Sequence, residues 1–153
     1  MTLLFSLRDY ADRDFDAIVE LDRECFEPGI AYPPPEMRRL LSLVTREGVI
    51  AESAETIAGF CLGYRAPRGT GRIITLDVRA DHRRSGVGRS LLEETIRRLR
   101  EAGAGETVLE VDLRNASAIA FYERLGFHRR RTIPGYYGPD RPGIEMSRES
   151  AGP

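Results

Sequence analysis

The sequence predicts a single domain of the α/β (α+β) class, with a mixed, mostly antiparallel central sheet of six to seven strands and about four flanking helices. The chain has 153 residues, and domains commonly contain about 100–150. Its hydrophobic fraction of 41% is ordinary for a globular protein. Strands precede and follow a central strand–helix–strand–helix stretch, which favours a mixed sheet over a doubly wound one. The domain is expected to span residues 1–149, with a flexible tail at 150–153.

Short helices and strands are expected to fill the first half of the chain. Phe15, Ile18 and Val19 repeat at helical spacing, and a connector with three consecutive prolines ends that helix. A second short helix has an apolar face made of Met37, Leu40, Leu41 and Val44. In chain order the elements are a strand, two helices and two strands, over residues 3–8, 12–26, 36–47, 49–52 and 56–64.

A long amphipathic helix is the main element expected in the second half. Its apolar stripe consists of Val87, Leu91, Leu92, Thr95, Ile96 and Leu99. Asn115 is expected to cap a further helix, which Gly126 ends. In chain order the elements are a strand, the long helix, a strand, the further helix and two strands, beginning near residues 72, 86, 107, 115, 127 and 144.

The composition excludes several chemistries. All 23 basic residues are arginine, so Schiff-base enzymes and the Walker A nucleotide site, which need a lysine, are ruled out. The net charge of -1 argues against nucleic-acid or membrane binding. Cys25, Cys61, His82 and His128 show no metal-ligand spacing. No signal peptide and no membrane-spanning apolar run is present. We therefore expect a cytoplasmic protein, monomeric or homodimeric, without a metal.

The loop before the long helix carries the clearest signal for a ligand. It reads Arg83-Arg84-Ser85-Gly86-Val87-Gly88-Arg89-Ser90. Glycines let a backbone approach a ligand closely, and the start of a helix offers free N–H groups and a positive dipole end. This combination is typical of a diphosphate cradle, with Arg83 and Arg84 as nearby cations. From spacing alone an ordinary strand-to-helix turn is an equal alternative, because the Rossmann and Walker A motifs do not fit.

Glu110 and Tyr122 form a second candidate pair. Strand alternation puts Glu110 on one face with Asp112 and Arg114, and Tyr122 lies on the following helix. A glutamate and a tyrosine that face one cleft can serve as base and acid. From the residues alone each has a structural alternative, a solvated carboxylate for Glu110 and a core ring with an exposed hydroxyl group for Tyr122.

Together these motifs resemble those of the GCN5-related N-acetyltransferases, the GNAT family. The loop at 83–88 resembles the acetyl-CoA signature of that family, Q/R-x-x-G-x-G/A. The stretch from Leu109 to Phe127, with Glu110 twelve residues before Tyr122, is most similar to the ribosomal-protein N-terminal alanine acetyltransferases. The segment Pro134-Gly135-Tyr136-Tyr137 resembles the double-tyrosine loop of that subgroup.

The resemblance implies an acetyl-CoA-dependent N-acetyltransferase whose expected acceptor is the N-terminal α-amine of a protein or peptide. Glu110 is implied as the general base, and Tyr122 as the general acid that protonates the departing thiolate. Acceptor contacts are implied for Tyr32, Tyr136 and Tyr137. Cofactor contacts are implied for Leu76, Asp77, Val78, Arg83, Arg84, Ser85, Gly86, Val87, Gly88, Arg89, Ser90 and Asn115.

Several alternatives stay open. The three-proline connector at 27–35 departs from the shorter, aromatic-rich loop of the ribosomal-protein enzymes, so a small amine or amino acid is the alternative acceptor. A non-catalytic acyl-CoA-binding module is the alternative of another class. Asp77 is a second carboxylate near the expected thioester position and an alternative base. Asn115 also has a capping role, and the three tyrosines are also compatible with ordinary loop packing.

Overall fold

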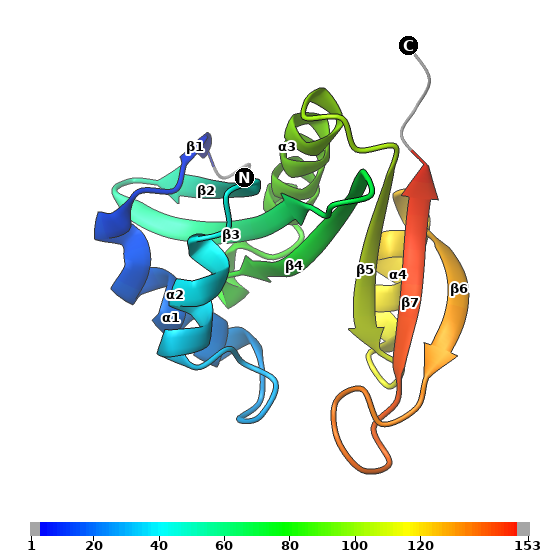
Figure 1. Cartoon of the computed structure of the whole chain (residues 1–153). Helices are drawn as coiled ribbons and strands as arrows, with labels where there is room; N and C mark the ends of the chain where they lie inside the picture. The colour runs from blue at the N-terminus through cyan, green and yellow to red at the C-terminus, as the bar shows by residue number, and fades with distance from the viewer. Residues whose placement is uncertain (1–3, 150–153) are drawn as a thin grey trace.

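The computed structural model describes residues 4–149, and a seven-stranded mixed sheet forms the centre of this part of the chain (Figure 1). The strand order is β1-β2-β3-β4-β5-β7-β6. The strands are β1 (Ser6–Asp9), β2 (Arg46–Ser53), β3 (Thr56–Arg65), β4 (Thr70–Val78), β5 (Glu106–Asp112), β6 (His128–Ile133) and β7 (Gly143–Glu149). The α-helices are α1 (Phe15–Cys25), α2 (Pro34–Leu41), α3 (Val87–Glu101) and α4 (Ala116–Arg124). The predicted fold class is confirmed, and the predicted tail lies outside the described residues.

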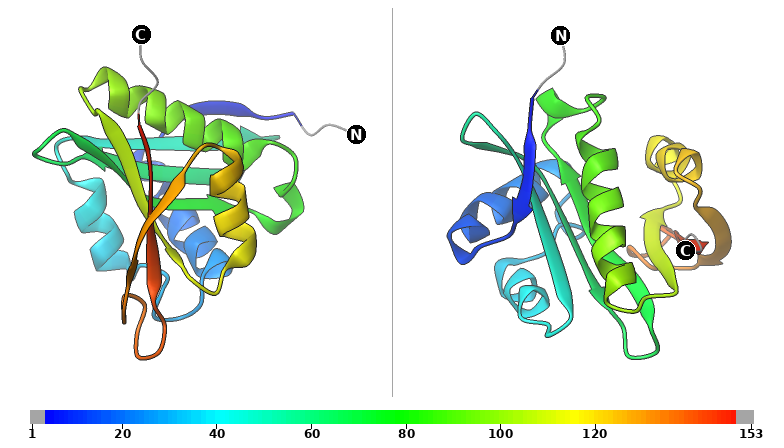
Figure 2. Two further views of the ribbon diagram at one scale, coloured as in Figure 1. Left: turned by 90° about the vertical axis from the view of Figure 1, so that its right-hand side faces the viewer. Right: turned by 90° about the horizontal axis from the view of Figure 1, so that it is seen from above.

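Helices cover both faces of the sheet. Seen from above in Figure 2, α1 and α2 lie on one side of β2 and β3, and α3 lies on the other. On the α1 side, Ile18, Met37 and Phe60 belong to one buried cluster. On the α3 side, the six buried residues of α3 are those of the predicted apolar stripe. Ile119 of α4 belongs to the same cluster as α3, so a single core connects both helices.

The N-terminal helices differ from the sequence-based expectation. The first predicted helix is divided into a short 3₁₀ turn at Asp12–Asp14 and α1. The second ends at Leu41, and β2 begins at Arg46. Nε of Arg46 donates a hydrogen bond to the carbonyl oxygen of Leu41 at 2.9 Å, which satisfies an acceptor at the end of the helix. Val44, expected on the apolar face of the helix, is therefore fully exposed. The helical spacing of the apolar residues therefore continues in the sequence beyond the last residue of α2.

The two central strands β4 and β5 pair over only three positions. The parallel pairs are Thr70 with Glu106, Gly71 with Thr107 and Arg72 with Val108. Beyond these positions β4 stays paired with β3, while β5 stays paired with β7. The two strands diverge, as Figure 1 shows. The divergence leaves one edge of each strand open and separates the sheet at its middle.

Candidate active site

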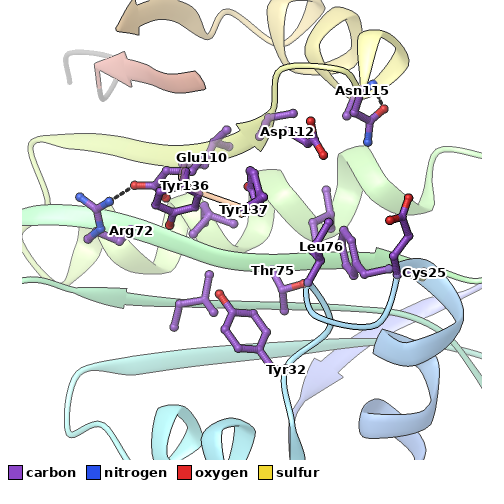
Figure 3. A pocket seen from close by; sticks show the side chains of 18 of the residues that line it. Cys25, Tyr32, Arg72, Thr75, Leu76, Glu110, Asp112, Asn115, Tyr136 and Tyr137 are labelled. Carbon is purple, nitrogen blue, oxygen red and sulfur yellow. Dashed lines mark hydrogen bonds and ion pairs between the residues drawn. The ribbon is translucent and has the colours of Figure 1, made fainter. Parts of the chain in front are cut away.

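A cleft of about 790 Å³ occupies the space between the diverging strands (Figure 3). Its walls come from β4 and β5, and it is closed by α4, the connector between α1 and α2, and the loop between β6 and β7. The fold thus brings together segments that are far apart in the sequence. The predicted site residues that line this cleft are Leu76, Glu110, Asn115, Tyr122, Tyr32, Tyr136 and Tyr137.

Glu110 projects from β5 into the cleft and is held by an ion pair with Arg72 of β4 (Figure 3). The two side chains meet where the strands begin to diverge, and only 11% of the Glu110 side chain is exposed. Burial raises the pKa of the Glu110 carboxyl group above its ordinary value, and the charge of Arg72 opposes that rise. A higher pKa makes the carboxylate a stronger proton acceptor, which suits a general base.

Tyr122 reaches the cleft from α4. Its ring makes edge contacts with Phe121 and Phe127, with centroid distances of 5.2 and 5.8 Å, and these contacts restrict its orientation. Burial raises the pKa of the Tyr122 phenol well above its ordinary value. The hydroxyl group therefore keeps its proton at neutral pH and can donate it to a developing anion.

Three tyrosines surround the part of the cleft that contains Glu110. The rings of Tyr136 and Tyr137 lie edge to face with their centroids 4.8 Å apart, and Tyr32 approaches from the opposite side (Figure 3). Burial raises the pKa of all three phenols, and the negative charge of Glu110 adds to the rise in each. Neutral aromatic rings around a carboxylate form an environment that suits a positively charged amine.

Arg141 connects the segments that carry these tyrosines. Its Nη2 donates to Asp112 Oδ2 at 2.7 Å, and its Nη1 donates to Glu27 Oε2 at 2.9 Å. Asp112 ends β5, Glu27 lies in the α1–α2 connector, and Arg141 lies in the β6–β7 loop. The sequence analysis did not find this residue, because its partners are 29 and 114 positions away.

The glycine loop presents an open surface at the start of α3. Gly86 has a φ of +89°, a conformation that favours glycine, and no atom lies within 4 Å of the position a Cβ would take. A Cβ on Gly88 would instead touch Val78 at 3.4 Å and Phe121 at 3.5 Å. Arg84 and Arg89 are exposed beside the loop. The N–H groups of the first helical turn have no acceptor within the helix, so they are available to a ligand.

Other predicted cofactor residues have structural contacts around this loop. Nε of Arg83 donates to the carbonyl oxygen of Val78 at 3.2 Å, so its guanidinium folds back on the end of β4. The hydroxyl group of Ser85 donates to the carbonyl oxygen of His82. The N–H of Ser90 donates to the carbonyl oxygen of Gly86, and Val87 is buried in the core.

The carboxyl group of Asp77, in β4, lies toward α1 and outside the cleft. The Asp77 side chain is fully buried and contacts Thr75, and Asp22 of α1 lies close enough to influence its pKa. Leu76, the residue before it, lines the cleft. This placement corrects the expectation of a second base: the Asp77 carboxyl group does not line the cleft, so it has no access to an amine there.

Asn115 caps α4, as the sequence predicts. Its Oδ1 accepts the N–H of Ala118 at 3.1 Å and the hydroxyl group of Ser117 at 3.2 Å. The residue also lines the cleft, so a second contact with a cofactor remains compatible with the capping role. Within residues 4–149 no three His, Cys, Asp or Glu side chains are grouped to hold a metal ion, and no helix there is long and apolar enough to cross a bilayer.

The divided sheet, the glycine loop and the cleft lined by Glu110 and Tyr122 indicate the class of protein, an acyltransferase fold. Residues 15–127 match the model of the acetyltransferase (GNAT) family. The chain belongs to the GNAT family and is an acetyl-CoA-dependent N-acetyltransferase, which confirms the resemblance found in the sequence.

Known proteins share both the sequence and the fold. An uncharacterized N-acetyltransferase of Methanocaldococcus jannaschii is 32% identical over 142 residues, which cover 92% of this chain and 88% of that protein. The [ribosomal protein bS18]-alanine N-acetyltransferase of Escherichia coli is 42% identical over 65 residues, which cover 42% of this chain and 44% of that protein. The crystal structure of the E. coli ribosomal-protein-S18-alanine N-acetyltransferase has a TM-score of 0.85 at 23% identity, covering 97% of both chains.

The residues of this chain fit an acyl-CoA donor. A putative acetyltransferase of Salmonella typhimurium, solved with its cofactor acetyl-CoA, has the same fold, with a TM-score of 0.77 at 20% identity and 98% of both chains covered. In the present chain the surface above Gly86 is open, whereas a Cβ on Gly88 would be in van der Waals contact with Val78. The free edges of β4 and β5 lead from this surface into the cleft.

Proposed function

We propose that the enzyme acetylates the N-terminal α-amine of a protein or peptide, with Glu110 as general base and Tyr122 as general acid. The observation that carries the proposal is that both side chains line one cleft between the free edges of β4 and β5. Burial raises the pKa of both groups, which makes Glu110 a stronger proton acceptor and keeps the phenol of Tyr122 protonated at neutral pH.

On the donor side the chain supplies backbone groups and cations. The first-turn N–H groups of α3 and the open loop at Gly86 hold a diphosphate, and Arg84 and Arg89 lie close by. The free edge of β4 at Leu76 offers main-chain groups to the amide arm of the donor, and an N–H near Val78 binds the acyl carbonyl oxygen. Acetyl-CoA supplies an activated thioester carbonyl when bound.

On the acceptor side Glu110 takes one proton from the ammonium group, directly or through a water molecule, which leaves a neutral amine. The amine nitrogen then forms a bond to the acyl carbon while the bond from that carbon to sulfur breaks. Tyr122 gives its proton to the departing sulfur, and the excess proton of the new amide nitrogen passes to the Tyr122 phenolate, directly or through water. The proton that Glu110 took from the ammonium group is released to solvent. The walls of Tyr32, Tyr136 and Tyr137 hold the amine beside Glu110.

A peptide acceptor is supported by the similarity to the ribosomal-protein alanine enzymes, and the cleft is open to a chain end. A small amine is the second candidate, because the three-proline connector beside Tyr32 differs from the loop of those enzymes. Release of CoA thiol with matched panels of peptides and free amines separates the two candidates. Turnover of free amines alone would select the second.

Two substitutions test the assigned roles. We expect Glu110→Gln and Tyr122→Phe each to lower kcat about 10²–10⁴-fold, the usual contribution of a general base or acid. Matched controls are Glu106→Gln, on the same strand but outside the cleft, and Tyr10→Phe, whose buried hydroxyl group has no partner. Full activity of both cleft variants would contradict the assignment.

A further inference from the structure

A buried network of two aspartates and a threonine lies behind the acceptor part of the cleft, and the proposed mechanism does not use it. Asp22 of α1 and Asp77 of β4 are both fully buried. Oγ1 of Thr75 lies 2.5 Å from Asp77 Oδ1 and 3.3 Å from Asp22 Oδ1. Asp22 Oδ2 also accepts the backbone N–H of Tyr32 at 2.7 Å. The network therefore joins α1, β4 and the connector that carries Tyr32.

The number of protons in this network follows from its geometry. The hydroxyl group of Thr75 carries one hydrogen, so it can donate to only one of the two carboxyl groups. Its other contact becomes a hydrogen bond only when the second carboxyl group is protonated and donates to Thr75. Asp22 accepts a backbone N–H at 2.7 Å, which favours its ionised form. Asp77 Oδ2 is buried without a partner, which favours the neutral form for Asp77.

The lack of a nearby cation supports the same assignment. No ion pair to Asp22 or Asp77 is found in the described part of the chain. Asp14 is a useful contrast, because it is also buried but forms an ion pair with Arg8 at 2.8 Å. That partner lowers the pKa of the Asp14 carboxyl group. Two ionised aspartates in contact without a cation would be strongly destabilising, so one proton must remain with the Asp22–Asp77 pair.

We propose that Asp77 keeps its proton at neutral pH and, through Thr75, holds ionised Asp22 in the position that anchors the Tyr32 connector beside β4. The hydrogen-bond chain runs from the Asp77 hydroxyl to Thr75, from Thr75 to Asp22, and from the Tyr32 N–H to Asp22. Thr75 and Tyr32 both line the cleft. The side chains of Asp77, Thr75 and Asp22 are therefore positioning residues for the acceptor. This step rests on the proposed function only in assigning the Tyr32 side of the cleft to the acceptor.

The surroundings of Asp77 give the inference a pH dependence. Burial and the charge of Asp22 raise the pKa of Asp77 well above its ordinary value. The other titratable groups that face it are Cys25 of α1, Cys61 of β3 and Tyr122 of α4. Burial raises the pKa values of these thiols and this phenol, so they stay neutral, and none of them can supply a positive charge. Because the folded pKa exceeds the unfolded one, stability is greatest below the unfolded pKa and falls as the pH rises toward the folded pKa.

The protonation state can be tested without any activity. We expect wild type to show the infrared carbonyl band of a protonated carboxyl group at neutral pH, and Asp77→Asn to lose it. Asp77→Asn should also flatten the fall in stability with rising pH. The matched control Asp14→Asn should retain the band and unfold more easily, because it loses an ionised partner of Arg8. If wild type shows no such band, the proposal is overturned.

Kinetics test the positioning role. We expect Asp77→Ala and Thr75→Val to raise the KM for the acceptor about tenfold through the loss of one hydrogen bond, with little change in the KM for acetyl-CoA. Asp77→Asn supplies an uncharged hydrogen-bond donor, so its KM for the acceptor should return most of the way to the wild-type value. Equal effects on both substrates, or no recovery by asparagine, would count against positioning. If no acceptor is turned over at all, the proposed function fails, while the infrared result still decides the protonation of Asp77.

Discussion

The parts of this enzyme that we propose to bind the donor and the acceptor are built in different ways. The donor part is local: eight consecutive residues, 83–90, supply a left-handed glycine, the start of a helix and exposed arginines. The acceptor part is assembled from the α1–α2 connector, β5 and the β6–β7 loop. Its geometry depends on long-range side-chain contacts, above all those of Arg141 and Asp22. In the proposed function, donor recognition thus depends on the backbone, and acceptor recognition depends on side chains that can change one at a time.

The largest expected effect comes from reversing the ion pair that joins β5 to the β6–β7 loop. Arg141→Asp and Asp112→Arg each place like charges where a 2.7 Å pair now exists. We expect each to lower kcat/KM for the acceptor about 10²-fold, while the KM for acetyl-CoA stays within about twofold, since truncating or reversing close charge pairs costs this much.

The double variant Arg141→Asp, Asp112→Arg sharpens this prediction. Restoring the opposite charges should recover about tenfold of the loss, as expected for coupled neighbours in a double-mutant cycle. Recovery should be incomplete, because an aspartate at position 141 would repel Glu27. Equal losses for donor and acceptor would show that the two parts are not built separately.

A smaller effect concerns the acidity of the base. Arg72 is paired with Glu110, and its positive charge lowers a pKa that burial raises. Removing the charge in Arg72→Met should raise the pKa of Glu110 further. Because the ionised form is the base, the acidic limb of kcat/KM moves to higher pH, and a shift of about one unit lowers activity about tenfold below the limb.

The control for this shift is Arg130→Met. Arg130 pairs with Glu106 on the same strand, but neither residue lines the cleft. We expect its pH profile to match that of wild type. A shift of the limb to lower pH in Arg72→Met would contradict the assignment of Glu110 as the base.

The same contrast explains what could be predicted from the sequence. The stripe of α3 and the cap at Asn115 are local patterns, and the structure confirms both. The shared cleft of Glu110 and Tyr122 was implied by the resemblance to the GNAT family, in which a glutamate lies twelve residues before the tyrosine, and both residues line one cleft in the structure. Arg72 could have been found only from the strand order, since it pairs with Val108 of β5 and its side chain reaches Glu110 two positions further on.

The remaining features depend on contacts that no local pattern encodes. Val44 keeps helical spacing yet lies beyond the end of α2, because the chain is turned by a hydrogen bond from Arg46. Asp77 was expected near the donor, but its carboxyl group is fully buried beside Thr75 and Asp22 and does not line the cleft. Asp22 looks like an ordinary polar residue of an amphipathic helix. Only the packing of α1 on β4 shows that it is fully buried and bonded to the Tyr32 backbone.

The smallest expected effect tests the donor part. Gly86→Ala forces a side chain into a φ of +89°, which costs about 1–2 kcal/mol for a residue with a Cβ. No atom lies within 4 Å of that Cβ, so the strain acts on the loop alone and moves the first turn of α3. We expect the KM for acetyl-CoA to rise about threefold to tenfold with the acceptor KM unchanged. Gly105→Ala, also without a neighbour within 4 Å but with an ordinary φ, should behave as wild type. A larger change in the acceptor KM than in the acetyl-CoA KM would show that the loop also serves the acceptor, and the separation of the two parts would fail.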